Sequence, residues 1–289
     1  IVRVVVRADT TEKLAGLEVP ERAQYLRVIS AELQRVASHL VATGFMLQEL
    51  GAFGTPLMYC FRERERILDL IEMLCGARIT LSYMRPGGVL QDAPEDFWPA
   101  LKILMDEMPQ YIDELEGLIT TNEVVVARTR DIGIVPPELA IAGSLTGPML
   151  RASGVEWDLR KADPYEVYDR VEFDVPIGHQ GDTFDRYYVR IQEMRESVRI
   201  VEQCVEQIPK GPVLPDGPFF LRPPVGDVYA AVEAPKGELG FYLVSDGGIS
   251  PYRCKIRAPS FINLTLLRDM LVGWKLADLV IIFGSTDVV

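Results

Sequence analysis

The chain has 289 residues, 48% of them hydrophobic, and a formal net charge of −12. That length and apolar fraction suffice for a sizeable core in one large domain or two ordinary ones. The negative charge disfavours nucleic acid and anionic lipid as partners, because their phosphates would be repelled. The sequence contains no run of about 18 apolar residues, so it predicts no membrane span.

The four cysteines lie at positions 60, 75, 204 and 254 and form no Cys-x-x-Cys pair. Zinc and iron–sulfur sites are typically built from such pairs, so the sequence predicts no metal site of its own. We interpret the cysteines as buried thiols of a cytosolic protein. Because the chain begins at Ile1 and ends at Val289, we expect both ends to be cut.

The first elements are a short strand and a long helix. Residues 1–9 are rich in valine, which predicts a strand. Pro20 suits the first turn of a helix, and an apolar stripe at helical spacing continues from there to about Leu50.

A polar row runs beside this apolar stripe. Glu32, Arg35 and His39 recur at helical spacing, and the plainer interpretation is a partly buried ion network between helices rather than a catalytic histidine. Glu49 lies at the end of the helix, where a carboxylate opposes the helix dipole. That placement indicates a partner or a raised pKa, with a solvated surface side chain as the alternative.

The stretch from 62 to 89 joins a charged helix start to an exit rich in glycine. Gly76 suits the end of this helix, because a residue without a Cβ tolerates the left-handed conformation. Arg78 and Arg85 follow where the backbone changes direction, and from composition alone we expect both to cap carbonyls or pair with acids. The apolar face of the predicted helix consists of Ile67, Leu70, Ile71 and Leu74.

A long loop-rich stretch covers residues 143–165. Such a loop is uncommon unless it is functional or buried at an interface. Arg151, Arg160 and Lys161 cluster in it beside Trp157. They are weak support for a nucleotide site, because no glycine-rich phosphate pattern occurs.

The most regular helix follows, capped by Asp182 or Thr183. Its a and d positions are apolar over three heptads, which predicts a bundle helix. Arg190 and Glu193 are three residues apart, and we interpret them as a surface pair worth a few tenths of a kcal/mol.

The last part of the chain predicts a β-meander. Arg253, Lys255 and Arg257 share one face of its third strand, so water, acids or a partner must cover three cations. Asn263 is predicted to cap a following helix, and Leu279–Phe283 to form a buried strand or segment. The three short alternating runs of the meander are 227–234, 239–245 and 252–258.

These patterns predict an α+β fold that is mainly a helical bundle with a small antiparallel β-meander. The bundle covers residues 12–208 and includes a loop-rich insert at 131–181. A Pro-rich crossing segment covers 209–226. The meander, with a C-terminal helix and strand, covers 227–289.

Several long segments together resemble one family. EKLAGLEVPERAQYLRVI begins at Glu12, and GARITLSYMRPGGV, VEAPKGELGFYLVSDG and PYRCKIRAPSF follow it. From about Glu12 to Val289 the chain resembles the D subunit, the 49 kDa-type quinone-site subunit of NADH-quinone oxidoreductase (respiratory complex I). That family is related to the large subunit of [NiFe] hydrogenases. Residues 1–11 depart from the helix expected before this stretch.

The resemblance implies one truncated hydrogenase-large-subunit-like domain in the peripheral arm of a proton-translocating oxidoreductase. It implies attachment to the cytoplasmic face of the cell membrane through partner subunits. These partners are the B, C, I and H subunits, of which B carries the terminal [4Fe-4S] cluster. The implied substrate is a quinone, and no cofactor is bound by the chain's own ligands. We expect the fragment alone to be inactive, because the family's quinone-contact His and Tyr lie upstream of the resemblance.

The resemblance also assigns site residues. Glu49 matches a position where the family usually has an aspartate that takes part in proton movement, and His39 is a second proton-handling candidate. Arg78 matches an arginine near the terminal cluster, where a cation would raise the cluster's potential. Thr80 matches a position where many members have a titrating histidine, and a threonine removes that titrating group.

Two alternatives stay open from the sequence. A hydrogenase-type large subunit needs two Cys-x-x-Cys pairs, one N-terminal to the given sequence and one after Asp287. A structural scaffold without quinone chemistry is the other alternative.

Overall fold

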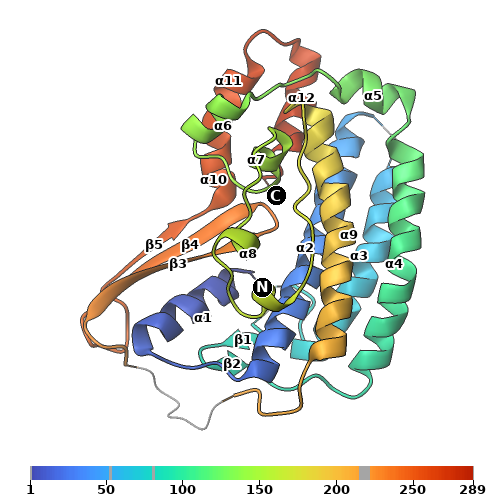
Figure 1. Ribbon diagram of the computed structural model, residues 1–289. Helices are drawn as coiled ribbons and strands as arrows, with labels where there is room; N and C mark the ends of the chain where they lie inside the picture. Colours follow the sequence, from blue (N-terminus) through green and yellow to red (C-terminus); the bar gives the residue numbers. More distant parts are fainter. Residues whose placement is uncertain (1, 52–53, 80–81, 215–221, 289) are drawn as a thin grey trace.

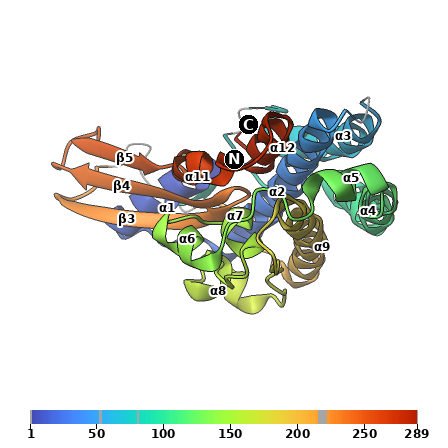
Figure 2. The ribbon, with the colours of Figure 1, turned by 90° about the horizontal axis from the view of Figure 1, so that it is seen from above.

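In the described part of the chain, four long helices stand side by side, and a three-stranded sheet lies beside them (Figures 1 and 2). The computed structural model describes every residue except 1, 52–53, 80–81, 215–221 and 289. Helix α2 contacts α3 and α9, and α4 also contacts both, so the four close into a bundle. These helices are α2 (Glu21–Glu49), α3 (Thr55–Cys75), α4 (Phe97–Ile119) and α9 (Thr183–Gln207).

The predicted ends and faces of the bundle helices are confirmed. Pro20 stands at the start of α2, and Asp182 caps α9 by accepting a hydrogen bond from the Asp185 amide. Gly76 closes α3 with φ +72° and donates its N–H to the Glu72 carbonyl. The apolar face of α3 is buried at all four predicted positions, Ile67, Leu70, Ile71 and Leu74.

The predicted meander is also confirmed. Strands β3 (Gly226–Ala234), β4 (Gly237–Ser245) and β5 (Arg253–Arg257) are antiparallel, in the order β3-β4-β5. Ala230 pairs with Phe241, and both are buried, so this sheet face belongs to the core. The α+β prediction therefore holds.

The turn between β3 and β4 packs directly against the backbone at Gly147. Gly147 (φ +69°) and Gly237 (φ +123°) meet backbone to backbone, since a Cβ placed on Gly147 would lie 2.5 Å from the Gly237 Cα. Only glycine combines these φ values with so close an approach.

The remaining elements are short. The β1–β2 hairpin, Met84–Arg85 with Gly88–Val89, follows α3. Helix α5 (Glu123–Thr129) precedes the predicted loop-rich part. Three short helices and a 3₁₀ turn lie within that part: α6 (Pro137–Ala142), α7 (Pro148–Ala152), α8 (Leu159–Ala162) and Tyr168–Arg170. The chain then ends through α10 (Pro259–Asn263), a 3₁₀ turn (Leu264–Leu266), α11 (Leu267–Leu271) and α12 (Leu276–Ser285).

Two predicted strands are wrong. Residue 1 lies outside the described residues. The rest of the strand expected at residues 1–9 is part of helix α1 (Val2–Ala15), which packs against β3 and β4, so tertiary packing overrides local β-propensity. The strand expected at Leu279–Phe283 is the middle of α12, which begins with a capping box and packs against α2. A five-residue apolar run does not distinguish a buried strand from a helix.

Two smaller predictions are also wrong. Asn263 caps no helix: it is the last residue of α10, and its buried amide group bonds Thr146 and the Lys236 carbonyl. Cys254 is exposed, because it lies on the edge strand β5, whereas Cys60 is buried as expected.

Candidate functional site

Charged side chains fill the space between α2, α7, α8, α9 and β3. Each is at most 2% exposed, which is rare for charged residues unless they are paired. We call this set the interior ion network: Glu32, Arg35, His39, Arg151, Asp158, Arg160, Glu193 and Glu233. The predicted ion network between helices is thus confirmed, and it is fully rather than partly buried.

Glu32 is the acceptor at one end of the network. Arg35 Nε donates to it at 3.1 Å and Arg160 Nη1 at 3.2 Å. The hydroxyls of Tyr168 and Ser197 donate at 2.6 and 2.7 Å. Burial alone would raise the pKa of Glu32, but the two guanidiniums and the hydroxyls outweigh it and lower the pKa to about 2.

Arg151 is the cation at the other end. It donates to Glu193 at 2.8 Å and to Glu233 at 2.8 Å, and Asp158 Oδ2 lies 3.5 Å away. Burial disfavours the charged guanidinium, yet the carboxylates outweigh burial and raise the pKa of Arg151. The arginine is therefore a permanent interior cation that joins α7, α9 and β3.

His39 lies at the same carboxylate. Its Nε2 is 2.7 Å from Glu193 Oε2, and its Nδ1 has no hydrogen-bond partner among the described residues. Burial lowers the pKa of His39, while Arg151 keeps Glu193 ionised by lowering its pKa against the effect of burial. His39 is consequently a neutral imidazole whose Nε2–H donates to Glu193.

The predicted surface pair of Arg190 and Glu193 is wrong. Both residues are buried, because this face of α9 is turned to α2 and α12. The Arg190 guanidinium donates to the carbonyls of Arg186 and Ser285 instead. Spacing on one helix gives the separation of two side chains but not the neighbour that covers them.

The arginines of the loop-rich part hold the fold rather than a nucleotide. Arg151 donates to the Trp157 carbonyl as well as to its carboxylates, and Arg160 is bound by Asp158. Lys161 lies 4.2 Å from the centre of the Phe173 ring. Both guanidiniums are already paired, so they are not available to a phosphate.

A small recess lies where the end of α2 meets α12. Phe45, Glu49 and Phe283 line it together with Asp287, and its volume is about 50 Å³. The Glu49 carboxylate lies directly over Gly284, where even a methyl group would overlap it. Glu49 is exposed, in line with the alternative of a solvated surface side chain, and its partial burial raises its pKa.

Asp287 connects this recess to the interior, and the sequence reasoning did not select it. Its buried carboxylate pairs with Lys236, and Oδ2 lies 3.9 Å from Arg190 Nε. Arg190 is one helical turn before Glu193 on α9, so charged groups continue from the recess to the network. A lone acid four residues after the end of an apolar run was the only signal for Asp287 in the sequence.

Arg78 lies apart from both places. It is part-exposed at the end of α3 and pairs with Glu65, Asp69 and Glu72 of that helix. The hydrogen bond that it donates to Asp69 is the main reason for its raised pKa. Pairing with acids was expected for Arg78 and is confirmed.

Arg85 and Thr80, from the same stretch of the chain as Arg78, have different outcomes. Arg85 is exposed and has no ion pair with any described residue, so the same expectation fails there. Thr80 lies outside the described residues. The structure thus brings His39 into the network and Glu49 to the recess, and leaves Arg78 on the surface.

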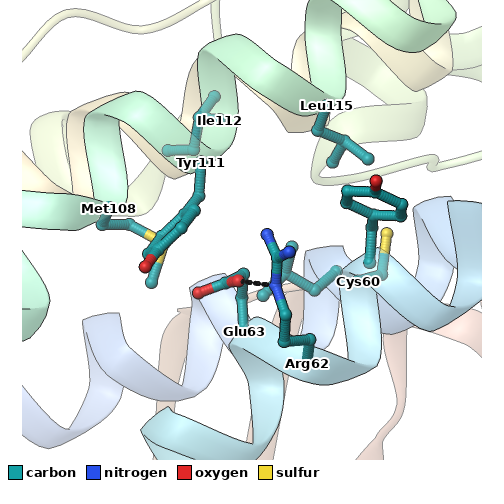
Figure 3. A pocket seen from close by; sticks show the side chains of 9 residues that line it. Cys60, Arg62, Glu63, Met108, Tyr111, Ile112 and Leu115 are labelled. Carbon is teal, nitrogen blue, oxygen red and sulfur yellow. Dashed lines mark hydrogen bonds and ion pairs between the residues drawn. The ribbon is translucent and has the colours of Figure 1, made fainter.

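A second charged cluster lies at the surface seam between α3 and α4 (Figure 3). Arg62 pairs with Glu63, donates to Glu114 at 3.1 Å, and lies over the rings of Tyr59 and Tyr111 at 4.8 and 5.2 Å. The cavity there is about 10 Å³, which is room for a single water at most. This seam is therefore a contact between helices and not a ligand site.

The described residues hold neither a cluster of metal ligands nor a membrane-spanning helix. No three His, Cys, Asp or Glu side chains in that part of the chain lie together so that they could hold a metal ion. Among the helices described, none is long and apolar enough to cross a membrane.

With bundle, meander and network in place, the chain can be compared with known proteins. It matches the family described as "Respiratory-chain NADH dehydrogenase, 49 Kd subunit" over residues 49–223 and 219–289. The D subunit of NADH-quinone oxidoreductase from Dehalococcoides mccartyi (strain ATCC BAA-2266 / KCTC 15142 / 195) is 58% identical over 278 residues, which are 96% of this chain and 76% of that protein. The D 1 subunit from Roseiflexus sp. (strain RS-1) is 53% identical over 290 residues, covering 98% and 78%.

The matches define the class as a subunit of an oxidoreductase complex. The chain belongs to the family of the 49 kDa subunit, also designated D, of NADH-quinone oxidoreductase. It therefore acts as part of complex I, with other subunits of that complex as partners, and the resemblance seen in the sequence is confirmed.

Proposed function

We propose that this chain forms part of the wall of the quinone site in the peripheral arm of the complex. The observation that carries the proposal is the recess between α2 and α12. Phe45 and Phe283 offer apolar rings there, 40% and 39% exposed, beside the carboxylates of Glu49 and Asp287. A quinone ring needs an apolar surface, and its reduction consumes two protons for every two electrons. The recess between α2 and α12 offers both an apolar surface and carboxyl groups that can supply protons.

The size of the recess indicates what else the site needs. Its volume of about 50 Å³ is well below the ~300 Å³ at which ligand pockets begin. In the proposed site, partner subunits supply the remaining walls. The B subunit supplies electrons from its [4Fe-4S] cluster, and this chain contributes no cofactor ligands of its own.

Glu49 is the proposed proton donor of the recess. Its side chain is exposed, but partial burial raises its pKa, so a larger fraction of Glu49 holds a proton near neutral pH than of a fully solvated glutamate. His39 is the proposed second proton-handling residue, in the interior rather than at the recess. It is neutral and hydrogen-bonded to Glu193, with one ring nitrogen still unpaired among the described groups.

The proposed setting of the chain is the cytoplasmic face of the cell membrane, where it is held by the B, C, I and H subunits. Arg78 and Thr80 are proposed to lie toward the neighbouring cluster. Ile79, between them, is 67% exposed, as expected for a residue that a partner covers in the assembly.

The test is Glu49→Gln in the assembled complex. Removing a general acid slows the step it serves by roughly 10²-fold or more, so quinone reduction by NADH should fall by that factor. NADH oxidation by ferricyanide, which needs no quinone site, should stay unchanged. Glu123→Gln is the matched control, since Glu123 is an exposed glutamate on α5. Quinone reduction at the wild-type rate in Glu49→Gln would sink the assignment.

A further inference from the structure

Strand β5 is the edge of the sheet opposite β3 (Figure 2). It pairs with β4 on one side, from Arg253 opposite Val244 to Arg257 opposite Gly240. Its other side faces no strand among the described residues. An unpaired edge presents a row of backbone donors and acceptors to which a further extended chain can bond.

One face of β5 borders an apolar recess. Cys254 and Ile256 point to it, together with their cross-strand neighbours Leu243 and Phe241 on β4. The recess has a volume of about 670 Å³, which is within the range of binding pockets. At its rim Ile249 is 71% exposed, and Ile256 is 48% exposed. A large exposed apolar surface of this kind marks a binding site.

The opposite face of β5 carries exposed cations. Arg253 and Lys255 are exposed and form no ion pair with any residue that the structure describes, whereas Arg257 is bonded to the Glu238 and Ser144 carbonyls. An acid on this face, Asp227, already accepts a hydrogen bond from the Tyr242 hydroxyl. Among the described residues, two neighbouring cations therefore have no ion-pair partner, on a chain whose net charge is −12.

We propose that the free edge of β5 and the recess beside it bind an extended segment of another subunit of the complex, in which acidic and apolar side chains alternate. Side chains of a strand alternate between the two faces of a sheet. An added strand would hence place its apolar side chains in the recess beside Cys254 and Ile256. Its acidic side chains would meet Arg253 and Lys255. The proposal rests on membership of the complex and does not depend on the proposed quinone site.

A second copy of this chain fits the edge poorly. If two β5 strands paired antiparallel about Lys255, that lysine would face its own copy, and Arg253 would face Arg257 of the other chain. Like charges directly opposite on paired strands are destabilising. Charge complementarity thus favours an acidic partner over self-association.

The first experiment measures the thiol of Cys254, which is exposed in the isolated chain. Maleimide labelling of Cys254 is followed by mass spectrometry in the isolated chain and in the assembled complex. A covering strand should slow labelling in the complex at least about tenfold. Equal labelling rates would overturn the proposal.

The second experiment identifies what covers the edge. A short amine-to-carboxyl cross-linker applied to the assembled complex should join Lys255 to an acidic peptide of another subunit. A cross-link to a second copy, to this same chain, or to no peptide counts against the proposal.

A charge-reversal variant separates the partner contact from folding. Arg253→Glu/Lys255→Glu should restore the Cys254 labelling rate in the complex to that of the isolated chain. Lys210→Glu/Arg268→Glu reverses two other exposed cations and should leave Cys254 protected. Protection that survives the β5 reversal would overturn the role of the two cations. Circular dichroism of both isolated variants confirms that each is folded.

Discussion

Two arginines of this protein have the same kind of partners in opposite surroundings. Arg151 meets Glu193, Glu233 and Asp158 with no exposed surface, and each of these carboxylates comes from a different part of the chain. Arg78 also meets three carboxylates, but all belong to α3 and all face water. The interior arginine joins separate elements, whereas the surface arginine fastens one helix to its own end.

The difference lies in what water does when a partner is removed. At the surface, water and salt replace a lost partner, so exposed ion pairs contribute little. In the interior nothing replaces it, and an uncompensated charge stays buried. We therefore interpret the interior ion network as a device that fixes how α2, α7, α8, α9 and β3 meet. Its net contribution to stability is a separate matter, since an apolar core of the same shape can be equally stable.

We expect Arg151→Met to have the largest effect on stability, because it removes the cation of a buried ion pair. Removing one partner of a buried ion pair costs about 3–5 kcal/mol, so the free energy of unfolding should fall by that amount in urea titrations. Arg195→Met is the matched control, because Arg195 also pairs with two carboxylates, Asp113 and Glu116, at the part-exposed surface of α9. The control should lose less than about 1 kcal/mol. Equal losses in the two variants would remove the distinction between interior and surface.

The pH dependence of the unfolding free energy provides a second test, at the side chain of Glu166. It is buried beside Arg27, and burial outweighs that arginine and raises the pKa of Glu166 from 4.5 to about 7. The folded state thus binds the proton more tightly than the unfolded state. The contribution of this group to stability is complete below pH 4.5 and is lost as the pH rises through 7.

The glutamine in Glu166→Gln cannot ionise, so this variant should not lose stability as the pH rises through 7. Between pH 4.5 and 8 the unfolding free energy of the wild type should fall by on the order of 3 kcal/mol more than that of the variant. Urea titrations at both pH values measure the difference. Glu18 is an exposed glutamate close to α1 and serves as the control. The unfolding free energy of Glu18→Gln should change with pH in the same way as that of the wild type. If the unfolding free energy of Glu166→Gln also changes with pH as that of the wild type does, Glu166 does not titrate between pH 4.5 and 8.

Arg78→Met should have the smallest effect on stability, with no measurable change in the urea midpoint of the isolated chain. In the assembled complex the proposed place of Arg78 predicts a second result. Loss of the cation should lower the potential of the neighbouring [4Fe-4S] cluster, as measured by a redox titration followed by electron paramagnetic resonance. An unchanged potential would leave Arg78 as a helix-end contact only.

Periodicity made the bundle predictable. The long helices α2, α3 and α9 show an apolar repeat over many turns, and their ends carry the side chains that such ends require, such as Asp182 and Gly76. The β-meander was equally visible, because its turn residues separate short alternating runs. Residues 1–9 and Leu279–Phe283 failed for the opposite reason: each run is too short to show a period, and packing decided its structure.

The sites were predictable only in part. Helical spacing located Glu32, Arg35 and His39, because they share one helix. Glu193 was predicted to lie on the surface, since a heptad pattern does not say which polar residues a neighbouring helix will cover. Asp287 was not selected at all, because its partner Lys236 is 51 residues away and the chain between them shows no common pattern.

The contact between Gly147 and Gly237 gives the molecule a mechanical property. Two backbones that touch without side chains between them have no soft layer that could absorb a displacement. The turn between β3 and β4 and the start of α7 must therefore move as one body. Four residues beyond Gly147 lies Arg151, so the short helix that begins at the meander turn also holds the central cation.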